Sequence, residues 1–240
     1  MPTDEVTPDS DHIRPGINEM LSRYHSGWYP CFMGEEPTGP VGWRKYTHRG
    51  IQWLDKLHVG KRQKSYVFAE RFEVKFDTAF DETVRGCAET VREGNTWITP
   101  HLVELYSQLH DMGHAHSFEC WEAGKLVGGA FGLQMGAMMT VESMFHTVDH
   151  ASKAAYVRTC THLQERGFKV VDVNHANTFF AGFGAETVPQ WQFEEILRDM
   201  RQLSPTFADD KPVPTLPLAV KIQLPVARIA TAIGKRLKIG

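Results

Sequence analysis

Residues 96–145 read TWITPHLVELYSQLHDMGHAHSFECWEAGKLVGGAFGLQMGAMMTVESMF, and this stretch decides the fold. Thr99 before Pro100 is typical of a helix start, because threonine caps the first turn and proline suits its first position. Apolar residues then recur at helical spacing until Gly113, which predicts the end of the helix. Three half-apolar segments with turn residues between them follow, at 115–122, 125–135 and 137–145. The stretch therefore predicts one helix and a three-strand meander.

Further regular elements are predicted on both sides of this stretch. They are a helix at 17–24, a strand at 72–76, a helix at 79–91, a helix at 151–166, a strand at 168–173, a strand at 186–189 and a helix at 190–203. Gly128 and Gly129 inside the second meander strand indicate a bulge or a close backbone approach. A meander followed by a helical crossover to a parallel strand is the acetyltransferase-like (GNAT) arrangement. The fold class is therefore α/β (α+β) with a GNAT-like mixed sheet.

Composition shifts divide the chain into four predicted regions. These are a disordered N-terminus at 1–15, a small N-terminal domain at 16–66, the GNAT-like domain at 67–203 and a proline-rich basic tail at 204–240. Residues 27–43 are rich in glycine, proline and aromatic residues, and we expect a packed loop there. The tail is either a mobile or docking segment, or a basic arm that contacts RNA phosphates.

The bulk composition is ordinary for a soluble globule of 240 residues, with 42% hydrophobic and 23% charged residues. Because the net charge is −3, a nucleic-acid partner requires a local basic patch such as Lys61, Arg62 and Lys64. The four cysteines are scattered without a CxxC motif, which favours free thiols in a reducing compartment. No apolar run has transmembrane length, and the acidic first residues do not resemble a signal peptide.

Two acidic residues are candidates for chemistry. Glu142 ends the third meander strand, where a carboxylate can also simply face water. Asp172 closes the apolar run at 168–173, and ligands gather beyond the strand ends of open α/β sheets. Asn174 falls on the same face as Asp172 if the chain is extended. No metal is expected, because the paired histidines near residue 115 lack a third ligand.

The turn before the helix at 151 argues against coenzyme A as the acyl carrier. A coenzyme A site needs free amides at a glycine-rich helix start to hold the pyrophosphate. Residues 146–153 read HTVDHASK, without glycine and with Asp149, whose charge would repel phosphate. The sequence therefore predicts acyl transfer from a different carrier.

Four motifs point to a family. TWITP (96–100), LHDMGHAHSFECW (109–121), LVGG (126–129) and VESMF (141–145) resemble TWIT, LHxxGxAHSxExW, LVGG and GESMF of the leucyl/phenylalanyl-tRNA–protein transferases. Shorter matches follow in the family's order, among them GWYP at 27–30, HRG at 48–50 and GAETVP at 184–189. The resemblance runs from about Gly27 to Leu197.

The resemblance implies a function and a set of partners. The expected reaction transfers leucine or phenylalanine from aminoacyl-tRNA to a protein with an N-terminal arginine or lysine, which marks that protein for degradation. It implies no cofactor, neither a metal nor coenzyme A, and no membrane partner. A cytoplasmic monomer with a small N-terminal domain before the GNAT domain is expected.

The resemblance also implies roles for individual residues. Asp172 is the base, Asn174 is the relay, and Glu142 holds the α-amino group of the donor or the cationic acceptor. Trp97 stacks on the terminal adenine, as aromatic rings do with unpaired bases. The rest of the aminoacyl-tRNA site falls on Cys31, Ala130, Met139, Val141, Met144, Tyr156 and Thr159. The phosphate contacts fall on Arg49, Lys61, Arg62 and Lys64.

The chain departs from the family pattern within this site. Asn174 replaces glutamine, Val141 replaces glycine, and Cys31 aligns with a second tryptophan. In the donor pocket, Met139, Tyr156 and Thr159 replace phenylalanine, leucine and phenylalanine. The sequence therefore leaves two alternatives to Leu/Phe transfer, which are a different donor amino acid and a noncatalytic protein that binds tRNA or basic N-termini.

Overall fold

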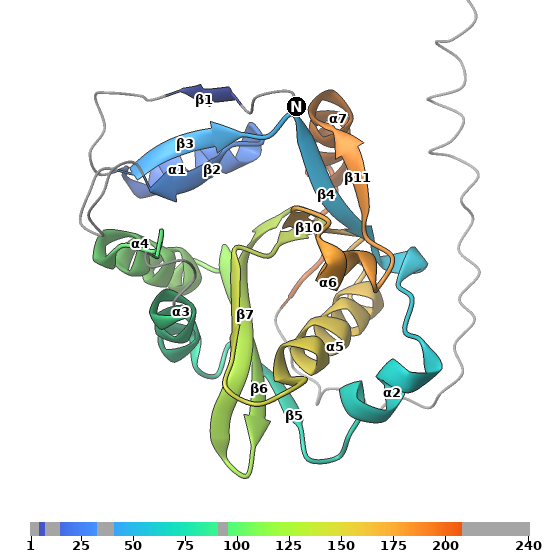
Figure 1. Ribbon diagram of the computed structural model, residues 1–240. Helices are drawn as coiled ribbons and strands as arrows, with labels where there is room; N and C mark the ends of the chain where they lie inside the picture. The colour runs from blue at the N-terminus through green and yellow to red at the C-terminus, as the bar shows by residue number, and fades with distance from the viewer. Residues whose placement is uncertain (1–4, 8–14, 33–40, 91–95, 208–240) are drawn as a thin grey trace, which may run out of the picture.

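The computed structural model describes residues 5–7, 15–32, 41–90 and 96–207 (Figure 1). A mixed sheet of eight strands forms its centre, in the order β11-β4-β10-β8-β7-β6-β5, and β9 also pairs with β7. The strands are β11 (Glu186–Pro189), β4 (His48–Trp53), β10 (Val170–Asn174), β8 (Met138–Thr140), β7 (Lys125–Met135), β6 (Ala115–Glu122), β5 (Glu73–Phe76) and β9 (Ser143–His146). Within these ranges β10 and β8 form the parallel pair, and the other pairs of this sheet are antiparallel.

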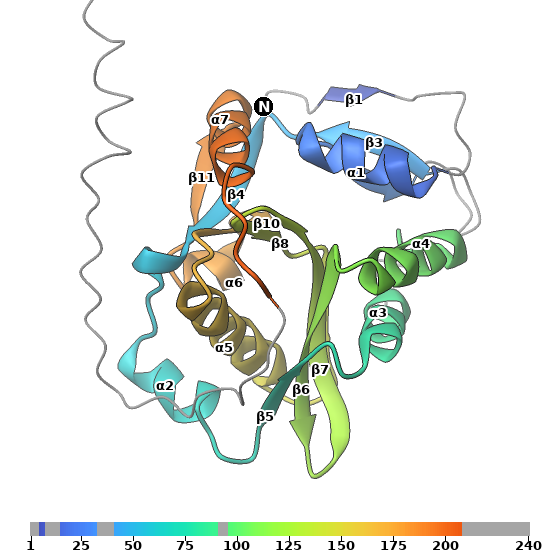
Figure 2. The same cartoon turned by 180° about the vertical axis from the view of Figure 1, so that it is seen from behind.

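Helices cover both faces of the sheet (Figures 1 and 2). Helix α5 (Ala151–Glu165) packs on one face of β7, while α3 (Phe80–Glu89) and α4 (Pro100–Asp111) cover the other. Neighbouring glycines in β7 make both contacts close. A Cβ on Gly128 would lie 2.9 Å from the Ala151 side chain, and one on Gly129 would lie 3.1 Å from Thr83 of α3. The predicted close backbone approach is therefore confirmed on both faces.

The start and the end of α4 confirm the sequence prediction. The Thr99 side chain accepts a hydrogen bond from the Leu102 N–H, and Pro100 occupies the first turn. Gly113, just after the helix, adopts φ +76°. The class predicted from the element order is confirmed as well, because α5 connects the meander to the parallel strand β10.

A second, three-stranded sheet stands beside the large one (Figure 1). Its strands are β1 (Glu5–Thr7), β3 (Val41–Lys45) and β2 (Tyr29–Phe32), and α1 (Ile17–His25) precedes β2. The prediction of a loop over 27–43 is wrong in its described part, because β2 pairs with β3 there. Likewise, residues 5–7 of the predicted disordered N-terminus form β1, and most of 1–15 lies outside the described residues.

The third meander strand, predicted as continuous over 137–145, is divided in two. Strands β8 and β9 both pair with β7, and Val141 and Glu142 lie between them. At this break the Thr140 hydroxyl accepts a hydrogen bond from the Leu133 N–H of β7. The Val141 N–H donates to the Asp172 carbonyl of β10 at 2.8 Å. The chain thus loses its pairing with β10 and continues along β7, and Glu142 lies at this break.

Strand β4 was not predicted from the sequence, and it lies inside the large sheet, between β10 and β11. It belongs to the segment 16–66, predicted as a small N-terminal domain, so the predicted boundary does not follow the sheets. The division into domains stays a prediction.

Four further elements lie around the sheet. They are η1 (Leu54–Lys56), α2 (Lys61–Val67), α6 (Thr178–Ala181) and α7 (Gln190–Met200), which ends before the predicted residue 203. Of the predicted tail, 208–240 lies outside the described residues, and Phe207 is buried against His116. None of the described helices combines the length and the apolar character needed to cross a membrane.

Candidate active site

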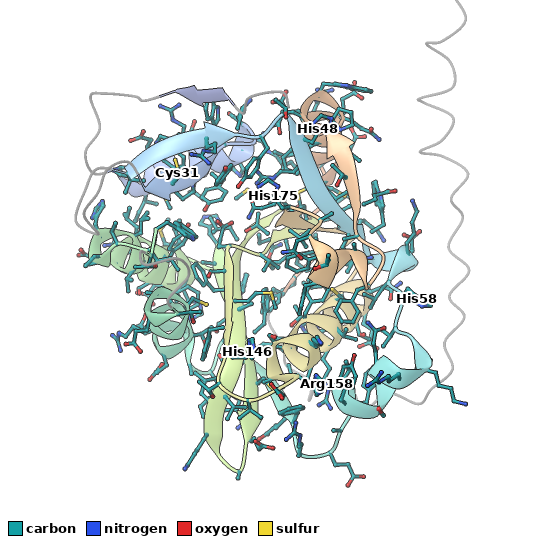
Figure 3. All side chains as sticks on the ribbon, in the orientation of Figure 1. Cys31, His48, His58, His146, Arg158 and His175 are labelled. Atoms are coloured by element: carbon teal, nitrogen blue, oxygen red, sulfur yellow. The ribbon has the colours of Figure 1, made fainter. Side chains whose placement is uncertain are left out.

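A cavity of about 590 Å³ lies where the two sheets meet α6. Its wall includes Cys31 of β2, Trp97 before α4, Glu142 at the β8–β9 break, and Asn174 and His175 at the end of β10. Cys31 and His175 are labelled in Figure 3. Segments far apart in sequence therefore meet at the carboxyl end of β10, which is the edge where the sequence predicted a ligand.

Hydroxyl groups from two elements hold Glu142, and a third hydroxyl supports one of them. The Thr140 hydroxyl donates to Oε1 at 2.6 Å, and the Tyr24 hydroxyl of α1 donates to Oε2 at 2.8 Å. The Tyr24 oxygen lies 2.7 Å from the Tyr106 oxygen of α4. These contacts fix the carboxylate on the cavity wall, and each oxygen keeps a lone pair for a further donor.

The surroundings of Glu142 make it a group that titrates near neutrality. Burial raises the pKa of Glu142 from 4.5 to about 7, although the hydrogen bonds from Thr140 and Tyr24 act in the opposite direction. The negative charge of Asp172 adds to the rise, while Arg49 opposes it. Glu142 can therefore both accept and return a proton near pH 7.

Asp172 lies behind the cavity wall and is almost fully buried, with 1% of the residue exposed. Arg49 of β4 binds it through Nε, at 2.9 and 3.0 Å from Oδ1 and Oδ2, and through Nη2, 2.7 Å from Oδ2. The Asn174 N–H donates to Oδ1 at 2.9 Å. Two partners thus neutralise and orient this carboxylate.

Asn174 lines the cavity, although Asp172 is not among the described residues that do. The pairing of β10 with β4 shifts register between these residues, and Asn174 adopts φ +59°. The expectation of one shared face assumed an extended chain, which the turn at Asn174 interrupts. The Asn174 side chain donates from Nδ2 to the Val141 carbonyl at 3.2 Å, and its Oδ1 has no hydrogen-bond partner within the described part of the chain.

A family model described as "Leucyl/phenylalanyl-tRNA protein transferase" matches residues 51–198. Proteins called leucyl/phenylalanyl-tRNA--protein transferase are similar over most of their length. One from Nitratidesulfovibrio vulgaris is 38% identical over 75% of this chain and 76% of its own, and one from Salinibacter ruber is 35% identical over 84% and 83%. The chain belongs to the leucyl/phenylalanyl-tRNA protein transferase family.

Among solved structures, FemX is similar with a TM-score of 0.47 and 11% identity, covering 60% of each chain. A GCN5-related N-acetyltransferase from Kribbella flavida gives a TM-score of 0.38 and 11% identity, covering 59% of this chain and 54% of its own.

The structure brings together only part of the aminoacyl-tRNA site implied by the family motifs. Cys31, Trp97, Val141 and Met144 line the cavity together with Glu142. Four further predicted residues are buried at 0–4% exposure and are not among its described lining, namely Ala130, Met139, Tyr156 and Thr159. Tyr156 packs against the rings of Phe179, Phe180 and Phe183.

The predicted phosphate-binding residues of this family member lie in two different places. Lys61, Arg62 and Lys64 are exposed on α2, which packs against α5. Arg49 is 1% exposed and paired with Asp172, so it does not reach the surface.

Other residues of the site were not predicted from the sequence. Tyr24 and Tyr106 hold or support Glu142, and Tyr46 stacks on Tyr29 with centroids 4.5 Å apart on the cavity wall. Single tyrosines give no local signal, since their function depends on residues about 80 to 120 positions away in the chain.

Among the described residues, no group of three or more histidine, cysteine, aspartate or glutamate side chains is arranged to hold a metal ion.

Proposed function

We propose that this protein transfers leucine or phenylalanine from aminoacyl-tRNA to proteins with an N-terminal arginine or lysine, and so marks them for degradation. The family membership supports this reaction. The observation that carries it is the cavity itself, where Trp97, Glu142 and Asn174 converge although none of them is adjacent in sequence.

The geometry suits the aminolysis of an ester. The donor is already an activated ester, so the enzyme needs only to align the two substrates and manage one proton. In our proposal Trp97 stacks on the terminal adenine. The anionic Glu142 attracts the α-amino group of the donor or the cationic acceptor. The Asn174 Oδ1, which accepts no hydrogen bond from the described residues, is suited to receive one from the attacking amine.

The residue that takes the proton from the attacking amine is the remaining role. The resemblance gives this role to Asp172, with Asn174 as relay, and the contact between the Asn174 N–H and Asp172 is compatible with such a coupling. The role of Asp172 stays a prediction, because Arg49 already occupies its carboxylate.

We further propose a cytoplasmic monomer. All four cysteines are buried free thiols, as is usual in a reducing compartment. Sedimentation velocity of the full chain tests the monomeric state.

The transfer assay uses a mixed pool of charged tRNAs in which one amino acid at a time is labelled. The acceptors are peptides that begin with arginine, lysine or alanine. Label should move from leucyl- and phenylalanyl-tRNA to the arginine and lysine peptides and not to the alanine peptide. Transfer of another amino acid would change the proposed donor. Binding of the basic peptides without transfer from any charged tRNA would support the noncatalytic alternative and contradict our proposal.

A further inference from the structure

The site holds two carboxylates, and only one of them borders the cavity. Glu142 lies on the cavity wall, whereas Asp172 lies behind it. The Arg49 guanidinium makes three hydrogen-bond contacts to Asp172, and the Asn174 backbone N–H makes one. An amine in the cavity therefore does not reach this carboxylate, whose oxygens are already held by Arg49 and the Asn174 N–H.

Glu142 is surrounded differently. Its described neighbours donate one hydrogen bond to each oxygen, from Thr140 of β8 and from Tyr24 of α1. The other titratable and charged groups that act on it are Tyr106 of α4, Asp172 of β10 and Arg49 of β4. Arg49 is committed to Asp172, so no cation of the described residues forms an ion pair with Glu142. Burial in these surroundings favours the protonated form, which makes the carboxylate a stronger base.

We propose that Glu142, and not Asp172, accepts the proton of the attacking amine during transfer; this inference rests on the transfer reaction proposed above. The amine nitrogen forms a bond to the ester carbonyl carbon, and the carbonyl electron pair moves onto its oxygen. The nitrogen of this intermediate passes one proton to the Glu142 carboxylate. When the carbonyl re-forms, the bond to the ribose oxygen breaks, and Glu142 returns the proton to that oxygen.

Asp172 then becomes a positioning residue. It holds the Arg49 guanidinium and the Asn174 N–H, and Asn174 in turn bonds the Val141 carbonyl next to Glu142. Loss of this carboxylate should disturb the β10 end and reduce stability, while the proton acceptor itself remains.

The test compares single-turnover transfer by the wild-type chain, Glu142→Gln and Asp172→Asn, with leucyl-tRNA and an arginine peptide at saturation. Glu104→Gln, an exposed change on α4, is the matched control. The acceptor amine itself titrates near pH 7.7–8, roughly the value of a free α-amino group, and would obscure a simple pH profile. The rate ratio of wild type to variant cancels this titration, because the amine is common to both reactions.

The Glu142→Gln variant should lose about 100-fold or more in rate at high pH, which is the usual range for a general base. The wild-type to Glu142→Gln ratio should rise with pH through about 7 and then level off, because only ionised Glu142 accepts a proton. The ratio for Glu104→Gln should be independent of pH. Asp172→Asn removes a charge that raises the pKa of Glu142, so its ratio should vary only where Glu142 titrates and should be constant at high pH. A protonated-carboxyl infrared band that titrates near pH 7 and is absent from Glu142→Gln would give the same assignment without turnover.

A flat ratio for Glu142→Gln would overturn the assignment, as would a pH-dependent ratio for Asp172→Asn alone. Failure of the underlying reaction has a different signature. If the wild-type chain transfers no amino acid from any charged tRNA, the proposed function and this inference fail together. If the wild type is active and Glu142→Gln is equally active, only the inference fails.

Discussion

At the residue scale, Arg49 and Asp172 form a buried ion pair behind the cavity, with Nη2 2.7 Å from Oδ2. The guanidinium also lies over the rings of Tyr29, Tyr46 and Phe193, at 4.8–5.7 Å from their centroids. Removing one partner of a buried pair leaves an uncompensated charge in a medium that solvates it poorly.

The Arg49→Met substitution should therefore lower the free energy of unfolding by about 3–5 kcal/mol. Urea denaturation at pH 7 measures this loss. The double variant Arg49→Met/Asp172→Leu should recover much of it, since neither charge remains. A loss below about 1 kcal/mol in the single variant, the value typical of exposed pairs, would show that the pair is not sealed from water.

Glu142 links stability to pH in the opposite direction from most carboxylates. Its folded pKa of about 7 lies above the ordinary 4.5, so the folded state favours the protonated form. The contribution to stability is complete below pH 4.5 and is lost as the pH rises through 7. Relative to Glu142→Gln, the wild-type chain should lose up to roughly 3 kcal/mol across this window, at about 1.4 kcal/mol per pKa unit. Urea titrations of both proteins on either side of the window measure the difference, and a pH-independent difference would contradict the raised pKa.

At the scale of elements, the break between β8 and β9 depends on Gly132 in β7. A Cβ there would lie 1.7 Å from the Thr140 carbonyl oxygen and 2.7 Å from its carbon, so the backbone itself would have to move. Because Thr140 also bonds Glu142, such a movement would displace the cavity carboxylate.

The Gly132→Ala substitution should destabilise the protein by about 3 kcal/mol or more, at the upper end for overpacked cores, and reduce transfer in the protein that still folds. Gly16→Ala is the control, because a Cβ at Gly16 meets no atom within 4 Å. Thermal unfolding of both variants gives the comparison. Equal melting temperatures of the two variants would mean that β7 and β8 can move apart at Gly132 without loss of stability.

Local signals explain which elements were predictable. Helix α4 has its capping threonine, its proline and its terminal glycine within its own sequence, so both ends were found. Strand β4 was missed because it is buried along most of its length and includes the polar Arg49 and Gln52, which break any alternating pattern. The split of β8 from β9 depends on β10, about 30 residues later, and no local pattern marks it.

The candidate site was predictable to a similar degree. Glu142 and Asn174 were identified from strand ends and family motifs, and both line the cavity. Asp172 was expected at an open edge, but its partner Arg49 is 123 positions away and could not be paired with it from sequence. Tyr24 and Tyr106 meet at Glu142 only through the packing of α1 and α4.

At the scale of the whole molecule, a chain with net charge −3 must bind tRNA through a local cationic surface. The exposed Lys61, Arg62 and Lys64 of α2 are the predicted contacts. Replacing all three with alanine should weaken tRNA binding and reduce the slope of log K against log salt by about two to three, or roughly one per lost phosphate contact. Lys125→Ala, an exposed change at the start of β7, should leave the slope unchanged. Filter binding over a salt series measures both, and an unaltered slope in the triple variant would place the tRNA elsewhere.

The internal position of β4 has a consequence for any shortened form of the protein. A gene fragment starting at residue 67 would omit the strand that separates β10 from β11 and leave both with unpaired backbone groups, which invite aggregation. The same fragment would discard Arg49 and Tyr24, so the carboxylates at the site would lose their anchors. The segment before residue 67 therefore supplies both the anchors of the site and the strand that keeps the large sheet paired.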